Sequence, residues 1–273
     1  MAASLPYVLQ PNKAPAGSNS WSCKPSAAHP RPVVLVNGTF TPMGLNWSVL
    51  APLLANNGYC VFALTYGVAP GSPPIVDQLG GFTSMKGSAR KLAAFVKKVL
   101  DATGAKKVDL IGHSQGTLMP NYWLKFLGGA KYVKNYISLA PLWHGTKLAA
   151  GMSEFSAVFG FDEDDAPFCT ACAQFGTKSK FMADMRKGGV AVDGIRYTNI
   201  MTKYDQLVVP YTSGHEPGMR NFVVQDFCKQ DHSEHFEIAA DPIGSVIVLN
   251  ALDPKHQRPA PCMLVLPYVG PVV

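Results

Sequence analysis

Short apolar runs alternate along this chain with longer segments whose apolar residues recur at helical spacing. The first apolar run covers residues 32–36 and the next covers 59–64, while residues 46–57 between them carry apolar side chains three or four positions apart. Apolar runs of this length, bounded by turn residues, are typical of buried parallel strands. Their alternation with helices predicts an α/β fold, in which helices cover both faces of a mostly parallel central sheet.

The same alternation continues almost to the end of the chain. Further strands are expected at residues 107–111, 132–139, 196–201 and 222–225, and further helices at 84–103, 117–127 and 243–252. Residues 1–31 have the composition of an irregular arm, and the interval 141–190, rich in Phe, Gly and Met, breaks the alternation. We therefore expect a single domain over residues 1–273, with 141–190 as a lid-like insertion near the strand ends where α/β proteins bind ligands.

The composition excludes several classes of protein. Hydrophobic residues make up 47% of the chain and charged residues 15%, which excludes a disordered polypeptide. No apolar run approaches the roughly 18–20 residues that a membrane span needs. The net charge of +6 comes from scattered basic residues, whereas a nucleic-acid-binding surface is normally clustered. We therefore expect neither a transmembrane protein nor a nucleic-acid partner.

The cysteines bear on both metal binding and cellular location. The chain has six cysteines, and only Cys169 and Cys172 lie close together in the sequence, where they form a C-x-x-C pair. A zinc site would need a second pair of ligands that this region lacks, so no metal is expected. An even number of cysteines favours three disulfides in an exported protein, although the spacing leaves their pairing open.

Gly112-His113-Ser114-Gln115-Gly116 is the motif that points to chemistry. It fits G-x-S-x-G, follows an expected strand and opens an expected helix, which is the setting of a nucleophile elbow. The sharp turn lifts the serine hydroxyl above the sheet, and a glycine on either side avoids clashes with the strand and the helix. The helix N-terminus behind the serine also favours negative charge. Ser114 is therefore the predicted nucleophile.

The partners of such a serine follow it in the order acid, then histidine. Asp205 comes just after the expected strand 196–201 and is the favoured acid, with Asp226, at the end of the following strand, as the next candidate. His232 and His235 both qualify as the base, and spacing alone does not choose between them. The backbone amides of Gln115 and Thr39 are the expected oxyanion donors, because one follows the nucleophile and the other follows an early strand.

Longer stretches of the chain resemble the bacterial class 2 lipase/esterase group of α/β-hydrolases. The matching stretches cover most of residues 21–262 and are 33–40, 58–64, 108–116, Leu139-Ala-Pro, His144-Gly-Thr, Tyr204-Asp205 and Asp253-Pro254. The resemblance implies Ser114 as nucleophile, Asp205 as acid and His235 as base, because the family carries its histidine at the Ser-X-His position. It also implies secretion and three disulfides, which are Cys23–Cys60, Cys169–Cys172 and Cys228–Cys262.

Two positions depart from the family pattern. Asn37 stands where the family usually has histidine, and Thr117 stands where a third glycine or similar small residue is common. The first substitution leaves the backbone donor of the oxyanion loop in place but changes the hydrogen bonds that support it. The second changes the packing beneath the elbow.

The resulting expectation is a serine carboxylic-ester hydrolase that works through an acyl-enzyme. Apolar acyl esters are the expected substrates, with polyesters as a further candidate and a lipid–water interface as a site of action. The expected substrate-binding residues are Phe40, Leu142, Trp143, Phe155 and Val158. No cofactor and no stable protein partner is expected. Two alternatives stay open, namely acyl transfer to an alcohol or sugar acceptor and a non-catalytic binding protein on a hydrolase fold.

Overall fold

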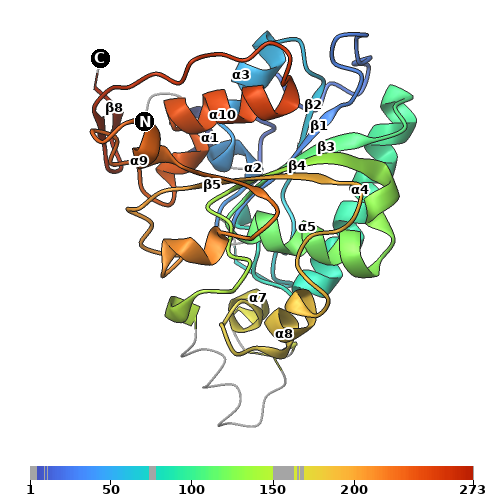
Figure 1. Ribbon diagram of the computed structural model, residues 1–273. Helices are drawn as coiled ribbons and strands as arrows, with labels where there is room; N and C mark the ends of the chain where they lie inside the picture. Colours follow the sequence, from blue (N-terminus) through green and yellow to red (C-terminus); the bar gives the residue numbers. More distant parts are fainter. Residues whose placement is uncertain are drawn as a thin grey trace.

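A six-stranded parallel sheet forms the centre of the molecule (Figure 1). The computed structural model describes residues 5–8, 10, 12–73, 78–149, 163–164, 166 and 169–272. The strands of the sheet are β1 (Val33–Val36), β2 (Val61–Leu64), β3 (Val108–His113), β4 (Val133–Leu139), β5 (Arg196–Met201) and β6 (Arg220–Val223). Their order across the sheet is β2-β1-β3-β4-β5-β6, and every neighbouring pair is parallel.

The strand order reverses direction once, between β1 and β3. The chain steps from β1 to β2 on one side and then returns past β1 to β3, after which each new strand is added on the other side. The loops that follow β1 and β3 therefore diverge at the carboxyl edge of the sheet. Ligands of α/β proteins bind in the crevice that forms at such a reversal.

Helices cover both faces of the sheet, as the alternation predicted (Figure 1). On one face lie α4 (Met85–Thr103) and α5 (Gln115–Phe126), and on the other lie α3 (Leu50–Asn56) and α10 (Pro242–Leu252). Alternate residues of β1 point to opposite faces, so Val34 packs with α4 and α5 while Val33 packs with α3 and α10. Each face thus has its own core, and the expected α/β fold is confirmed.

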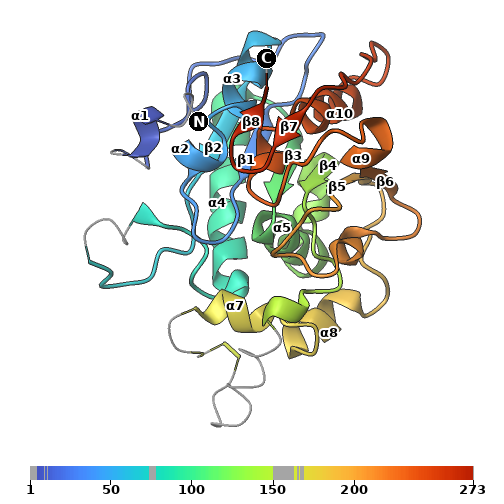
Figure 2. The same ribbon diagram turned by 90° about the vertical axis from the view of Figure 1, so that its left-hand side faces the viewer.

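Shorter elements surround this sandwich. They are α1 (Leu5–Val8), α2 (Met43–Asn46), α7 (Thr170–Gln174), α8 (Lys180–Arg186), α9 (Val224–Phe227) and the antiparallel strands β7 (Val265–Leu266) and β8 (Gly270–Pro271). Two of them, α7 and α8, lie together beyond the ends of α4 and α5 (Figures 1 and 2). Within the described part of the chain, no helix is both long enough and apolar enough to cross a bilayer.

Several expected boundaries shift. The helix expected at 46–57 is shortened to α3, and α2 precedes it as a separate turn of helix that was not expected. Pro52 falls in the first turn of α3, where its missing N–H costs no helical hydrogen bond. The strand expected at 222–225 lies at Arg220–Val223, because the next residues wind into α9. The short β7–β8 hairpin was not predicted, since two-residue strands leave no periodic signal in the sequence.

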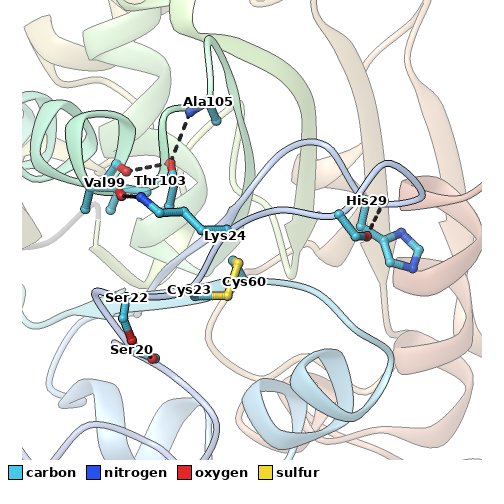
Figure 3. Close-up of a disulfide and its surroundings, with 11 residues drawn as sticks. Ser20, Ser22, Cys23, Lys24, His29, Cys60, Val99, Thr103 and Ala105 are labelled. Atoms are coloured by element: carbon cyan, nitrogen blue, oxygen red, sulfur yellow. Dashed lines mark hydrogen bonds between the residues drawn. A yellow bond between two sulfur atoms is a disulfide. The ribbon is translucent and has the colours of Figure 1, made fainter.

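The N-terminal arm is tied to the outer edge of the sheet. The Cys23–Cys60 disulfide joins it to the residue before β2, and Lys24 Nζ donates to the carbonyl of Ala102 at 2.6 Å (Figure 3). Ser18 also forms an isolated parallel bridge with Val61 in β2. The arm therefore covers an edge strand that would otherwise present unpaired backbone groups. The other two disulfides are Cys169–Cys172 and Cys228–Cys262, so all three pairings implied by the resemblance are present.

Candidate active site

Ser114 occupies a strained turn between β3 and α5. Its backbone angles are φ 54° and ψ −126°, in a region that residues with a side chain rarely adopt. A Cβ added at Gly112 would lie 2.0 Å from the carbonyl oxygen of Gly116, and one added at Gly116 would lie 2.1 Å from that of Val36. Only glycine fits at these two positions, so the turn has the close packing that a nucleophile elbow requires.

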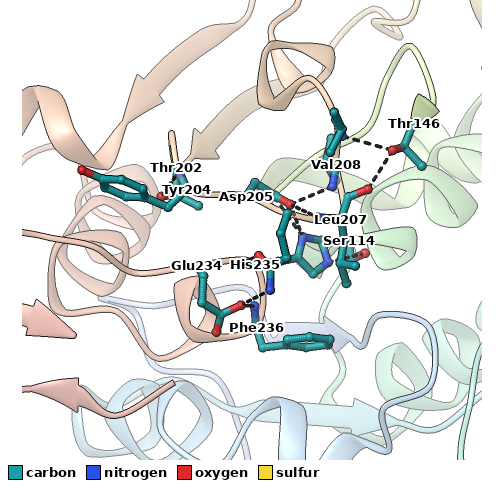
Figure 4. Close-up of polar contacts among 12 residues, drawn as sticks. Ser114, Thr146, Thr202, Tyr204, Asp205, Leu207, Val208, Glu234, His235 and Phe236 are labelled. Atoms are coloured by element: carbon teal, nitrogen blue, oxygen red, sulfur yellow. Dashed lines mark hydrogen bonds and ion pairs between the residues drawn. The ribbon is translucent and has the colours of Figure 1, made fainter. Parts of the chain in front are cut away.

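A chain of hydrogen bonds joins Ser114, His235 and Asp205 (Figure 4). His235 Nε2 lies 2.9 Å from Ser114 Oγ, and His235 Nδ1 lies 2.9 Å from both carboxylate oxygens of Asp205. The side chains of His235 and Asp205 are each only 2% exposed. The ring of His232 instead packs at a tilt against Tyr204, with ring centroids 4.9 Å apart. Position in the sequence left both histidines open as the base, and the structure brings His235 to the serine.

Backbone amides hold the Asp205 carboxylate in place. Its Oδ1 accepts hydrogen bonds from the N–H of Leu207 at 2.9 Å and from the N–H of Val208 at 2.7 Å (Figure 4). Two donors on one oxygen fix the rotation of the carboxylate. The carboxylate is thus oriented toward the imidazole before any substrate binds.

Thr39 and Gln115 lie beside each other next to Ser114. Thr39 Oγ1 donates to Gln115 Oε1 at 2.6 Å, and a Cβ added at Gly38 would lie 3.1 Å from Ser114 Cβ. Phe40 N–H donates to the Gly80 carbonyl at 2.8 Å, which fixes the loop after β1. Among the described residues we find no protein acceptor for the backbone N–H of Thr39 or of Gln115. Both amides are therefore available to an oxygen held above the serine.

The two departures from the family pattern have local hydrogen-bond partners. Asn37 is fully buried, and its Nδ2 donates to the carbonyls of Gly38 and Thr41, so it closes the oxyanion loop on itself. The hydroxyl of Thr117 donates to the carbonyl of Ser114 at 2.7 Å, which fills the space beneath the elbow. The support that histidine would give the loop is thus supplied here by an amide.

A cleft of about 180 Å³ opens beside Ser114. Apart from Ser114 and the histidines, its walls are largely apolar and include Phe40, Leu142, Leu148, Ala149, Cys172, Phe175, Leu207, Val208 and Phe236. The hydroxyl of Thr146 also reaches the cleft, but it donates to the Leu207 carbonyl at 2.7 Å and accepts from Val209 N–H. Such a cleft favours an apolar ligand, because its walls offer few unpaired polar groups.

The expected substrate-binding residues separate into three groups. Phe40 and Leu142 line the cleft. Trp143 does not, because it is buried in the core, where its Nε1–H donates to Asn199 Oδ1 at 3.0 Å. Phe155 and Val158 lie outside the described residues, as does part of the expected lid-like insertion.

The sequence analysis did not single out several of the lining residues. Val208 and Phe236 could have been found, since each lies within three positions of a predicted site residue. Phe175 carries no such signal, because it follows the short helix α7 in a segment whose path the sequence left undefined.

Two buried carboxyl groups, those of Asp231 and Asp241, flank His235 in the sequence. Asp231 Oδ1 accepts from Ser233 N–H at 2.9 Å, and Asp241 Oδ1 caps α10 by accepting from Gly244 N–H at 2.6 Å. Both side chains are fully buried, and no donor is found among the described residues for the second oxygen of either. Burial raises the pKa of Asp241 to about 8, and the neighbouring carboxyl of Asp231 adds to the shift. The Asp241 carboxyl is therefore largely protonated at neutral pH.

This combination of fold and site defines an α/β-hydrolase, with a serine elbow after a central strand and an acid and a histidine on later loops. The chain belongs to the lipase (class 2) family, whose model matches residues 30–246. A triacylglycerol lipase of Pseudarthrobacter phenanthrenivorans and one of Burkholderia plantarii are each 51% identical to this chain over 55 residues. That stretch is 19% of this chain and covers only 17% and 15% of the two relatives.

Solved structures show the same fold at low sequence identity. Aspergillus fumigatus lipase B is 20% identical, with a TM-score of 0.67 over 91% of this chain and 56% of that protein. The mature form of the Bacillus licheniformis lipase BlEst2 is 17% identical, with a TM-score of 0.60 over 84% of this chain and 94% of that protein. This chain thus spans little more than half of the Aspergillus lipase and nearly the whole of the mature BlEst2.

Proposed function

We propose that this protein is a carboxylic-ester hydrolase, a lipase or esterase, with Ser114 as its nucleophile, His235 as its base and Asp205 as its acid. The observation that carries the proposal is the hydrogen-bonded chain of these three side chains, of which Ser114 and His235 line an apolar cleft. Membership of the class 2 lipase family supports the same reaction. Three disulfides also favour a secreted protein.

The geometry defines a role for each group in acyl transfer. His235 Nε2 accepts the proton of Ser114 Oγ as that oxygen attacks the ester carbonyl, while Asp205 holds Nδ1–H and stabilises the imidazolium that forms. The amides of Thr39 and Gln115 donate to the developing oxyanion, and losing one such donor costs about 3–4 kcal/mol in other enzymes. His235 then returns the proton to the leaving alcohol, and water repeats the cycle to release the acid.

The size of the cleft limits the acyl group. Its volume of about 180 Å³ is small beside the roughly 300–1,000 Å³ of typical ligand pockets. We therefore propose short to medium-length acyl chains as the preferred substrates. Phe40 and Phe236 at the cleft are 50% and 45% exposed, which also leaves room for the chain of a polyester to approach.

Hydrolysis of p-nitrophenyl esters from C2 to C16 tests the proposal. Wild-type protein is expected to turn over esters with an optimum at short to medium acyl lengths, and Ser114→Ala is expected to fall to background. Ser20→Ala, which removes an exposed hydroxyl of the N-terminal arm, is the matched control and should keep full activity. A folded wild-type protein that is inactive at every length would refute the proposal. Product analysis with an added alcohol separates hydrolysis from acyl transfer.

A further inference from the structure

The side chain of His113, the residue before Ser114, lies against the segment that carries His235. His113 ends β3 and is 2% exposed. Its Nε2 lies 2.8 Å from the carbonyl oxygen of His235, and its Nδ1 lies 3.0 Å from Asn46 Oδ1. The reaction described above gives this buried imidazole no part in proton transfer.

The position of the ring hydrogen follows from the two partners. Asn46 Oδ1 already accepts from Gly38 N–H at 2.9 Å, and it lies 3.0 Å from the hydroxyl of Thr41, whose one hydrogen can go either to it or to the Gly38 carbonyl at 3.1 Å. Asn46 Oδ1 thus has other donors besides His113. The carbonyl of His235 can only accept, and among the described residues we find no donor for it other than His113. A buried carbonyl without a donor is costly, so the hydrogen belongs on Nε2.

Burial also determines the charge of this ring. Desolvation, reinforced by the neighbouring His235, lowers the pKa of His113 to about 3. The ring is therefore neutral near pH 7. That matters because the centroids of the two imidazoles are only 5.0 Å apart, and a charged His113 would oppose the imidazolium that forms on His235 during catalysis.

We propose that His113 is a positioning residue, which donates from Nε2 to the backbone carbonyl of His235 and thereby fixes the base relative to the nucleophile. The bond closes a ring of contacts, because His113 is covalently joined to Ser114 and Ser114 Oγ is hydrogen-bonded to His235 Nε2. His235 is thus held at its backbone as well as at its side chain. This inference rests on the proposed ester hydrolysis and adds a residue to its machinery.

Two substitutions of His113 distinguish its hydrogen bond to the His235 carbonyl from a role in filling space. The amide nitrogen of Gln reaches about as far as Nε2 of His, whereas that of Asn reaches only as far as Nδ1. We expect His113→Asn to lower kcat about 100-fold, the effect of misplacing a reacting group by about 1 Å, with KM nearly unchanged. His113→Gln should restore most of kcat. The matched control is His232→Asn, whose ring contacts Tyr204, and its kcat should stay at the wild-type value.

A measurement on the wild-type protein keeps the test decisive if a variant does not fold. The ¹⁵N chemical shifts of the His113 ring report which nitrogen carries hydrogen, and we expect a neutral ring with hydrogen on Nε2 from pH 5 to 9. Hydrogen found only on Nδ1, equal losses of kcat in the Asn and Gln variants, or no loss in either would overturn the proposal. Inactive wild-type protein would instead refute the ester hydrolysis and leave the NMR result to decide this hydrogen bond.

Discussion

Replacing Asp205 by Asn removes one charge from the site and leaves its size unchanged. The carboxylate lies 2.9 Å from His235 Nδ1, so the centres of the two charges are roughly 4 Å apart when His235 is protonated. At the effective dielectric constant of about 20 that suits such sites, this attraction is worth about 4 kcal/mol, or roughly a 1,000-fold change in rate.

The hydrogen bonds of the carboxylate add to this loss. Oδ1 is held by the amides of Leu207 and Val208, so the oxygen of Asn is expected to stay there and its NH₂ group to take the place of Oδ2. That NH₂ group would face His235 Nδ1 and favour the tautomer with hydrogen on Nε2, which cannot accept the proton of Ser114. We therefore expect kcat to fall by about 10³- to 10⁴-fold.

The assay is kcat for p-nitrophenyl butyrate across pH 6–9, with thermal melting to confirm that the variant folds. The control is Asp226→Asn, which changes an exposed carboxylate bound to Lys203 at 3.0 Å. It should leave kcat within about twofold, since surface ion pairs contribute about 0–1 kcal/mol. If folded Asp205→Asn kept a tenth or more of the wild-type kcat, the assignment of Asp205 as the acid would be wrong.

Three further predictions concern stability. Gly116→Ala should lower the free energy of unfolding by about 3 kcal/mol, because its Cβ would meet a backbone carbonyl of β1. Gly87→Ala, with open space around its Cβ inside α4, should instead raise it by about 1 kcal/mol. Urea titration of both variants checks this, and a stable Gly116→Ala would count against the tight elbow. A carboxyl whose pKa is raised to about 8 on folding makes stability fall as pH rises from about 4 to 8, because the unfolded state ionises first. Asp241→Asn should therefore flatten that decline in urea titrations at pH 5, 7 and 9, and an unchanged slope would contradict the raised pKa of Asp241. Removing the Cys23–Cys60 disulfide, whose cysteines are 37 positions apart, should lower the free energy of unfolding by about 4 kcal/mol. Removing Cys169–Cys172, whose cysteines are 3 positions apart, should lower it by only about 2 kcal/mol, and equal shifts of the melting temperature in calorimetry would contradict this loop-entropy argument.

The features that depend on residues close together in the sequence were predictable from it. The strands of the sheet and its two helical layers follow from the spacing of apolar residues, and the elbow follows from glycines on either side of Ser114. Asp205 was favoured because it comes just after a predicted strand, which brings its side chain to the same edge of the sheet as the serine.

Features set by packing across the chain were harder to predict. His232 and His235 both lie after the last strand of the sheet, and only the path of the folded segment brings one of them to Ser114. Leu142 and Trp143 are adjacent and both apolar, yet one lines the cleft and the other packs in the core. Burial of this kind depends on partners far away in the sequence.

The site draws its groups from distant parts of the chain, and this determines when it can form during folding. Ser114 and His235 are 121 positions apart, and Thr39 and Gln115 are 76 apart. Contacts of such long range form slowly, because the chain must lose much of its freedom before they contribute any stability. Recovery of ester hydrolysis during refolding should therefore follow the recovery of helix content, so the appearance of activity marks the completed fold.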